Sequence, residues 1–329
     1  MEKIKIILDV DTGSDDAIAI ITALLSDELN VLGITTVNGN KPVENTTENT
    51  LRVLDAIGSK VPVYRGCCTT LISELSPARV SRVGAEETID ENGEVVAYHS
   101  EYLNLPSAKN KAQDKSAVCY IIETIMNSDD DISIVAVGPL TNIATAMRAE
   151  PRIINKIKRI VLMGGGYKVA NVTPAAEFNI WKDPEAAQIV ITSGANVLLV
   201  PLDATHAGCM TYKESEEFRK IGTPSSNIVA ELIEERIKAY NAMQPMEIPD
   251  SAPPHDALAV CAIIDESVLK DIRFERIDVD FSGGLCDGMT VIDERPFTPP
   301  KNAYIALGCD RNKFINMVRQ RLIKNKLSK

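Results

Sequence analysis

From its first residues, the sequence alternates between short continuous apolar runs and segments with the periodicity of an amphipathic helix. Residues 4–8 predict a buried strand, 16–26 a helix and 31–37 a second strand, which together make a βαβ unit. The alternation continues with predicted helices at 43–57, 141–148 and 184–192 and predicted strands at 132–137, 159–163 and 196–201. Strands joined by helices in this way form a mostly parallel central sheet flanked by helices on both faces, so the predicted fold class is α/β.

The second half of the chain is mainly helical. Predicted helices lie at 214–221, 228–243 and 256–264, followed by β-like runs at 274–281, 289–293 and 303–307 and a terminal helix. The proline-rich stretch 244–254 cannot continue a helix and predicts a loop beside a site. No linker or repeat divides the chain, so we predict a single domain over residues 1–329.

The composition excludes several classes of protein. Asp and Glu number 46 against 35 Lys and Arg, and a net charge of −11 disfavours nucleic acid and anionic membranes as partners. The basic residues of 311–329 are interpreted as a solvated helix face. The seven cysteines form no CxxC pair, which argues against disulfides and zinc. Reduced thiols and an N-terminus without a targeting segment predict a cytoplasmic protein.

Four carboxylates, Asp9, Asp11, Asp15 and Asp16, fall within eight residues directly after the first predicted strand. Ligands bind at this end of the strands in open α/β sheets. Like charges this close repel one another, and a hard divalent cation would offset them. An EF-hand is excluded, because the twelfth position counted from Asp9 is Ile20, where a glutamate is required. Gly13 is expected to permit a tight turn within the cluster.

Two other interpretations of these carboxylates stay open at this point. In the first, Asp9 and Asp11 merely end a strand, while Ser14 and Asp15 cap the next helix. In the second, the stretch 9–12 resembles the start of Mg²⁺-dependent phosphatases of the haloacid dehalogenase type. The adjacent acids Asp15 and Asp16 count against the second, because such phosphatases do not need them so close to the nucleophile.

The DxDxxxDD pattern, however, resembles the N-terminal signature of the nucleoside hydrolase family, of the inosine-uridine preferring type. Further segments match that family in order: Val37-Asn38-Gly39-Asn40, Val137 to Ala144, Met163 to Gly166 with Asn171, Ala176 to Ile180, Asp183 to Ala187, and Pro254-His255-Asp256-Ala257. Together they cover nearly the whole chain. The resemblance implies the open-sheet fold of that family, with 77–115 and 240–254 as loops around a base pocket.

The resemblance also implies an activity and a site. The activity is hydrolysis of the N-glycosidic bond of a ribonucleoside to ribose and free nucleobase, with Ca²⁺ as cofactor and Asp11 as general base on a calcium-bound water. The implied calcium ligands are Asp11, Asp16, Asp256 and the carbonyl of Val137. The implied ribose-binding residues are Asp15, Asn40, Asn171, Glu177 and Asn179. His255 lies where some relatives protonate the departing base, and Asp9 and Met163 support the site.

The sequence departs from the family pattern at 98–106. This segment aligns with a His-Gly-x-x-Gly loop but lacks both glycines, which predicts a different backbone path. We expect His99 and Tyr240 to line the base side of the pocket, and Trp181 to have a packing role. The family also implies a homodimer or homotetramer. A non-catalytic ribose- or nucleoside-binding protein on the same fold remains an alternative, because a complete set of site residues does not prove turnover.

Overall fold

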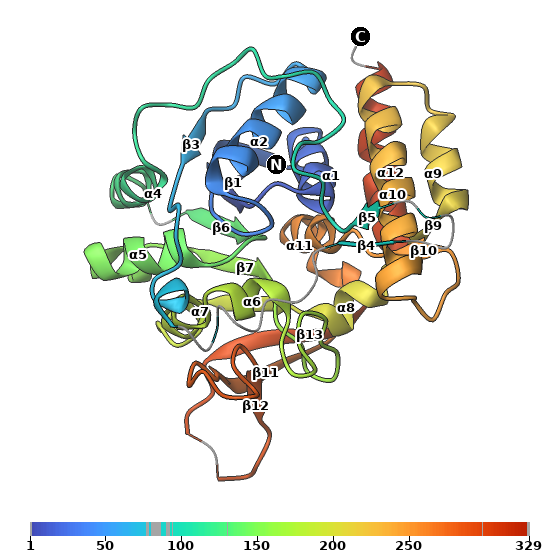
Figure 1. Cartoon of the computed structure of the whole chain (residues 1–329). Coiled ribbons are helices and arrows are strands. Elements are labelled where there is room, and N and C mark those ends of the chain that lie inside the picture. The colour runs from blue at the N-terminus through green and yellow to red at the C-terminus, as the bar shows by residue number, and fades with distance from the viewer. Residues whose placement is uncertain are drawn as a thin grey trace.

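The computed structural model describes residues 2–76, 79, 87–89, 93, 95–129, 131–297 and 299–327. In the described part of the chain, nine strands form one sheet in the order β12-β11-β13-β8-β7-β6-β1-β2-β3 (Figure 1). Neighbouring strands from β13 to β3 are parallel, and β11 runs antiparallel to both β12 and β13. The sheet is mostly parallel with an antiparallel edge, which confirms the predicted fold class.

The strands of this sheet are β1 (Ile4–Val10), β2 (Leu29–Thr36), β3 (Val63–Arg65), β6 (Ile132–Ala136), β7 (Arg159–Met163), β8 (Val197–Val200), β11 (Leu269–Val279), β12 (Thr290–Asp293) and β13 (Ala303–Cys309). Two short hairpins lie outside it: β4 (Glu87–Ile89) with β5 (Val95–Ala97), and β9 (Met210–Thr211) with β10 (Ser251–Ala252). The helices are α1 (Ser14–Leu24), α2 (Val43–Ile57), α4 (Ala117–Met126), α5 (Thr141–Ala149), α6 (Phe178–Lys182), α7 (Pro184–Ile191), α8 (Leu202–His206), α9 (Tyr212–Arg219), α10 (Pro224–Met243), α11 (His255–Ile264) and α12 (Arg311–Leu327).

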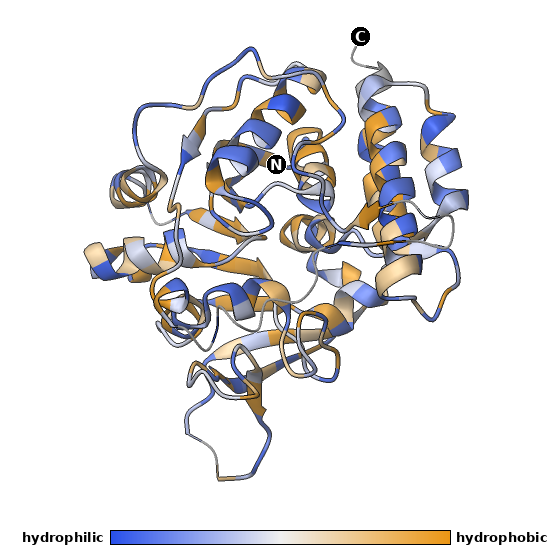
Figure 2. Ribbon diagram, viewed as in Figure 1, coloured by the Kyte–Doolittle hydropathy of each residue, from blue (hydrophilic) through white to orange (hydrophobic). Residues whose placement is uncertain are grey.

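Alternate residues of the central strand β1 face two separate hydrophobic clusters. Ile6 and Leu8 pack in one cluster with residues of α1, α10, α11 and α12, whereas Ile7 packs in the other with residues of α4, α5 and α7. Figure 2 shows the corresponding apolar colouring of the strands and of the helices that cover them. Because successive side chains of a strand point to opposite faces, both faces of β1 are buried, as in other doubly covered parallel sheets.

The direction in which successive strands are added to the sheet reverses at β1, and this reversal positions the site. From β1 the chain moves outward through β2 to β3, then returns to pair β6 with the other side of β1 and continues to β7 and β8. The connections after β1 and β6 therefore lead to opposite sides, which opens a crevice at the carboxyl ends of these strands.

Some predicted boundaries are confirmed and others are wrong. Residues 43–57 and 159–163 are α2 and β7 as predicted. Helix α10 starts at Pro224, where Thr223 accepts a hydrogen bond from the Ser226 amide, and it continues to Met243. The loop predicted for 240–254 therefore begins only after Met243. Of the loop predicted for 77–115, residues 77, 78, 80–86, 90–92 and 94 lie outside the described residues.

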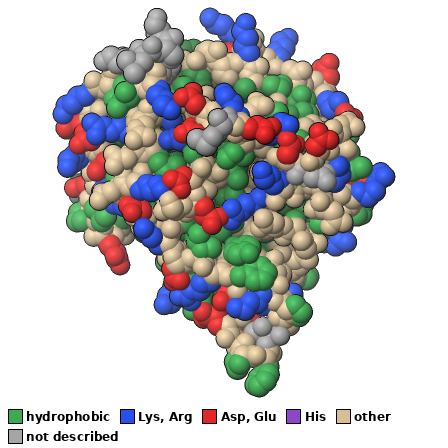
Figure 3. All heavy atoms as spheres, turned by 180° about the vertical axis from the view of Figure 1, so that it is seen from behind, with side chains coloured by type: hydrophobic (Ala, Val, Ile, Leu, Met, Phe, Trp, Pro, Cys, Tyr) green, Lys and Arg blue, Asp and Glu red, His purple; other side chains and the backbone are tan. Residues whose placement is uncertain are grey.

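The surface agrees with the composition. Figure 3 shows basic and acidic side chains interspersed over one face of the molecule. The terminal helix is not wholly solvated, contrary to prediction, because Arg321 is buried and donates to Ser26 Oγ at 2.7 Å. No helix within the described residues has both the length and the apolar character needed to cross a bilayer.

Candidate functional site

Four buried carboxylates, Asp11, Asp15, Asp16 and Asp256, form the acidic cluster at the carboxyl end of β1. Asp11 follows the strand, Asp15 and Asp16 lie in the first turn of α1, and Asp256 lies in the first turn of α11. Carboxylate oxygens of Asp15, Asp16 and Asp256 all lie within 4.8 Å of one another. Residues 240 positions apart in the sequence therefore meet at one point.

The start of α1 explains how Asp16 is held. Its carboxylate accepts hydrogen bonds from the amides of Gly13, at 2.9 Å, and Asp11, at 3.1 Å, so Asp16 caps the helix as well as belonging to the cluster. The chain bends at Gly13, as predicted, but its φ of −105° is not the left-handed conformation that favours glycine. A side chain is excluded there for another reason: the ring of His99 occupies the space that a Cβ would need.

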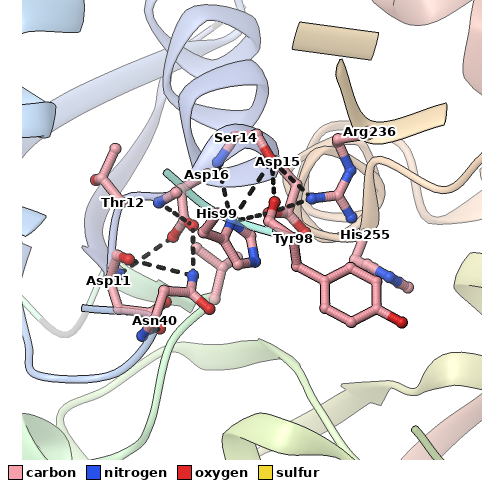
Figure 4. A network of polar contacts seen from close by, with 12 residues as sticks. Asp11, Thr12, Ser14, Asp15, Asp16, Asn40, Tyr98, His99, Arg236 and His255 are labelled. Atoms are coloured by element: carbon pink, nitrogen blue, oxygen red, sulfur yellow. Dashed lines mark hydrogen bonds and ion pairs between the residues drawn. The ribbon is translucent and has the colours of Figure 1, made fainter. Parts of the chain in front are cut away.

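The two carboxylate oxygens of Asp11 differ in their hydrogen bonding. Its Oδ2 accepts from the Asn40 amide at 2.7 Å, whereas its Oδ1 is buried without a hydrogen-bond partner among the described residues. The side chain of Asn40 donates to Asp11 O at 3.2 Å and to Asp16 Oδ2 at 3.3 Å, which ties the two acids together (Figure 4). Gly39 and Gly138 flank the Asp11 carboxylate closely.

Burial gives the cluster an unusual protonation equilibrium in the metal-free chain. It raises the pKa of Asp16 to about 7, with a further contribution from the charge of Asp15. It also raises the pKa values of Asp11 and Asp256 well above the ordinary range, and neighbouring carboxylates add to both. A bare buried oxygen and several hard carboxylate ligands with excess negative charge fit a divalent cation such as Ca²⁺.

Residues behind and beside the cluster are also connected to it. Asp9 accepts from Thr35 and, at 2.8 Å, from Asn142 Nδ2, and burial raises the pKa of Asp9 to about 7. The carbonyl of Val137, a predicted calcium ligand, accepts from Asn179 Nδ2 at 2.8 Å. The same amide donates to Met163 O at 3.1 Å, so the ends of β6 and β7 are bridged by Asn179.

The other predicted sugar-binding residues lie at and before α6. Glu177 caps this helix, accepting from the amides of Asn179 and Ile180, and its Oε2 also accepts from Gly165 N at 2.8 Å. Burial raises the pKa of Glu177 to about 7 despite these bonds. Asn171 accepts at Oδ1 from the Phe178 amide at 3.0 Å. The backbone thus fixes both side chains before any ligand arrives.

A cavity of about 560 Å³ lies over these residues. Asp15, Asp256, Asn40, Asn171, Glu177 and Asn179 all line it, whereas Asp11 and Asp16 lie behind them. Its aromatic lining, which we call the aromatic wall, consists of Tyr98, His99, Phe178, Trp181, Tyr240 and His255. His99 and Tyr240 thus both line the cavity, and their contact with a base stays a prediction. Trp181, expected only to pack, also lines the cavity.

His255 is buried in the aromatic wall with a partner on each ring nitrogen. Its Nε2 lies 2.6 Å from the Tyr240 hydroxyl and its Nδ1 lies 2.7 Å from Thr205 Oγ1. Burial, with the nearby charge of Arg236, holds the pKa of His255 well below its usual range. His255 is therefore a neutral imidazole at neutral pH, and because both of its partners are hydroxyl groups that can donate or accept, either ring nitrogen can carry the proton.

The sequence analysis missed Thr205, Phe178 and Arg236. Arg236 is buried at the cluster and pairs with Asp15 at 2.9 Å. Its signal was present: in the predicted helix 228–243, Arg236 falls in an apolar stripe formed by Val229, Leu232, Ile233, Ile237 and Tyr240. A charge in such a stripe indicates a buried partner.

The fold and this site define a class: α/β proteins with an acidic, metal-suited crevice at the sheet's reversal point, next to a cavity large enough for a small polar ligand. The family model described as inosine-uridine preferring nucleoside hydrolase matches residues 6–316. The chain belongs to that family. This confirms the predicted family and the predicted enzyme class, and it favours neither the phosphatase interpretation nor a mere helix cap.

Individual relatives are similar over nearly their full lengths. An inosine-uridine preferring nucleoside hydrolase of Leishmania major is 38% identical over 314 residues, covering 94% of each chain. A pyrimidine-specific ribonucleoside hydrolase RihB of Escherichia coli O17:K52:H18 is 36% identical, covering 97% of each. The solved structure of a purine-preferring ribonucleoside hydrolase from Gardnerella vaginalis superposes with a TM-score of 0.84 at 33% identity, covering 98% of each. The names of these relatives state different base preferences: inosine and uridine, pyrimidines, and purines.

Proposed function

We propose that this chain hydrolyses the N-glycosidic bond of ribonucleosides to ribose and free nucleobase, with Asp11 as the general base. The observation that carries the proposal is the bare, buried Oδ1 of Asp11 in an acidic cluster beneath a cavity of nucleoside size. A carboxylate without a donor on one oxygen is available to take a proton. Family membership supports the reaction class.

We propose Ca²⁺ as the metal, held by the carboxylates of Asp11, Asp16 and Asp256 and the carbonyl of Val137. These are hard oxygen donors, and the negative charge buried with them needs an offset. When bound, the ion would supply positive charge, coordination sites for hydroxyl groups and a lowered pKa for a water. Asp15 also lies within reach of Asp16 and Asp256.

The chain's own residues would hold the ribose and stabilise its charge. Asp15, Asn40, Asn171, Glu177 and Asn179 line one side of the cavity with oxygen acceptors and amide donors suited to hydroxyl groups. Cleavage of a ribosyl bond builds positive charge on the ring, as in other glycoside hydrolysis. The carboxylates of Asp15 and Glu177 would stabilise that charge, while Asp11 Oδ1 accepts the proton of the attacking water.

The aromatic wall would bind the base and assist its departure. A neutral His255 that carries its proton on Nε2 donates to the Tyr240 oxygen, which frees the Tyr240 hydroxyl proton to point at a ligand. Burial raises the pKa of Tyr240 above its ordinary range, so this group keeps its proton at neutral pH. His255 would thus act as a leaving-group catalyst together with Tyr240 rather than as an imidazolium.

We also propose a cytoplasmic homodimer or homotetramer. The free thiols of Cys68, Cys119 and Cys286 are exposed, which fits a reducing compartment. The oligomeric state rests on family resemblance alone and is measured directly by light scattering on the purified protein.

The test is reducing-sugar release from inosine, adenosine, guanosine, uridine, cytidine and their 5′-phosphates, with the metal content of the protein determined. We expect ribose release by the wild type and a loss of about 10³-fold in Asp11→Asn. The exposed acid Asp27, which pairs with Lys324 far from the site, supplies the control Asp27→Asn, expected to be fully active. A protein that binds calcium stoichiometrically but releases no ribose would favour the non-catalytic binding alternative.

A further inference from the structure

Arg236 is a buried cation directly beside a crowd of buried acids. Its side chain is 3% exposed, and its Nη1 pairs with Asp15 Oδ1 at 2.9 Å. Burial disfavours the charged guanidinium, but Asp15 and, to a lesser degree, other carboxylates outweigh it and raise the pKa of Arg236. Among the described residues, Arg236 is the arginine that forms an ion pair with the acidic cluster.

The guanidinium is held on several sides, so it cannot follow a displaced partner. Nε and Nη2 both donate to the carbonyl of Pro253, at 3.2 and 2.9 Å, and Nη1 donates to Ser14 Oγ at 2.9 Å. The ring of Tyr240 lies 5.4 Å from its central carbon. Arg236 therefore connects α10 to the start of α1 and to Pro253, two residues before α11, and these two helices carry most of the acidic cluster (Figure 4).

The members of the acidic cluster differ in what occupies their oxygens. Asp15 Oδ1 lies against a fixed guanidinium, and it is an ion-pair partner there without an aligned hydrogen bond. Within the described part of the chain, the hydrogen bonds to the Asp16 carboxylate come from neutral amides, and Asp11 Oδ1 has no hydrogen-bond partner. A carboxylate already paired with a cation offers less negative charge to a metal ion than one that is unpaired. Asp15 also lines the cavity, whereas Asp11 and Asp16 lie behind it.

We propose that Arg236 is a positioning residue that divides the acidic cluster: it reserves Asp15 for the ribose hydroxyls and leaves the metal ion to Asp11, Asp16 and Asp256. The inference rests on the proposed function, since it assigns a sugar to the cavity. Without Arg236, the three mutually close carboxylates of Asp15, Asp16 and Asp256 would all be available to the cation, and Asp15 would turn from substrate binding to metal binding.

The first experiment measures metal binding alone. Calcium is titrated calorimetrically into metal-free wild type and Arg236→Met. We expect Arg236→Met to bind Ca²⁺ more tightly, by about three- to tenfold, because a positive charge has been removed and a carboxylate released. Weaker binding by the variant, with the fold intact by circular dichroism, would overturn the proposal.

The second experiment measures sugar discrimination as the ratio of kcat/KM for a ribonucleoside to that for its 2′-deoxy analogue. Arg236→Met is expected to reduce this ratio at least about tenfold, because Asp15 no longer points at the hydroxyl. In an Asp15→Asn background, where the contact is already lost, Arg236→Met should change the ratio no further. An unchanged ratio in the single variant, or equal effects in the two backgrounds, would contradict action through Asp15.

Controls separate this role from simple loss of stability. Arg321 is also buried, and it donates to Ser26 Oγ at 2.7 Å and Met317 O at 2.8 Å, outside the acidic cluster. Arg321→Met should lower the melting temperature while leaving calcium affinity and the sugar ratio unchanged. Arg236→Lys, which keeps the charge, should restore wild-type calcium affinity. If the wild type cleaves no nucleoside, the proposed function fails, whereas the calcium arm still tests the effect of Arg236 on the cluster.

Discussion

The acidic cluster and the aromatic wall contribute to one cavity, yet they are built differently. Three of the four cluster acids follow β1 or begin α1, so a single strand–helix connection of the central sheet places them. The aromatic wall combines residues from the 98–99 segment, α6, α10 and the start of α11. The cluster is thus fixed by the core of the fold, while the wall depends on peripheral segments. On the proposed function, the reaction and the sugar are specified by the first and the base by the second.

The largest expected effect tests the sugar side. Removing the 2′-hydroxyl should leave the polar groups of Asp15 and the metal site without partners and reduce kcat/KM by about 10³-fold. The measurement compares inosine with 2′-deoxyinosine and uridine with 2′-deoxyuridine. The reduction should be equal for both bases if the two sides act independently. Comparable rates on ribo and deoxyribo substrates would contradict the placement of Asp15.

The acidic cluster should also dominate the pH dependence of stability. In the metal-free chain, Asp16 and Glu177 have folded-state pKa values of about 7, above the ordinary values of 3.8 and 4.5. The folded state therefore binds more protons than the unfolded state between about pH 4 and 7, and stability falls as pH rises through this window, by about 4 kcal/mol for Asp16 and about 3 kcal/mol for Glu177.

Thermal unfolding of metal-free protein should consequently give a melting temperature several degrees higher at pH 5 than at pH 8. Saturating Ca²⁺ should remove the contribution of Asp16 to this difference in melting temperature and leave the contribution of Glu177. A change in the aromatic wall, such as His99→Ala, should not alter the slope of the melting temperature against pH. A melting temperature that rises with pH in the metal-free protein would show that burial does not control these carboxylates.

A smaller effect is expected from His255→Ala, and it should depend on the leaving group. Loss of the hydrogen bond to Tyr240 should lower kcat for natural nucleosides by about 10²-fold. It should change the rate on p-nitrophenyl riboside, whose leaving group needs no protonation, by less than about threefold. Tyr240→Phe should show the same selectivity. Equal losses on both kinds of substrate would assign His255 to sugar or metal binding, on the other side of the cavity.

The smallest effect is expected from His99→Ala. The ring of His99 packs against Gly13, its Nδ1 accepts from the Ser14 amide at 3.2 Å, and the side chain lines the cavity. We expect changes of up to about tenfold in the relative rates on the five nucleosides, with calcium affinity unchanged. Unchanged kinetics for every base in both His99→Ala and Tyr240→Ala would remove these residues from the base pocket.

The same contrast explains what the sequence could predict. Asp11, Asn40 and Val137 each follow a buried strand, and parallel strands bring their carboxyl ends to one edge, so local patterns place these residues. The contacts of Arg236 with Asp15 and of His99 with Gly13 depend on how α10 and the 98–99 segment pack across the molecule. Neither is encoded in local spacing. The predicted end of α10 at Met243 is confirmed, but its start lies at Pro224 and not at residue 228, because Thr223 caps the helix one turn earlier.

The two glycines beside Asp11 have a consequence for how this site can change. A Cβ at Gly138 would lie 2.6 Å from Asp11 Oδ1, and one at Gly39 would overlap Oδ2. Any side chain at either position would displace the carboxylate, so both positions should tolerate replacement as poorly as Asp11 itself. Redesign of this crevice for other chemistry would therefore begin with the backbone path of two loops, and variation in nature or in a mutant library should accumulate in the aromatic wall.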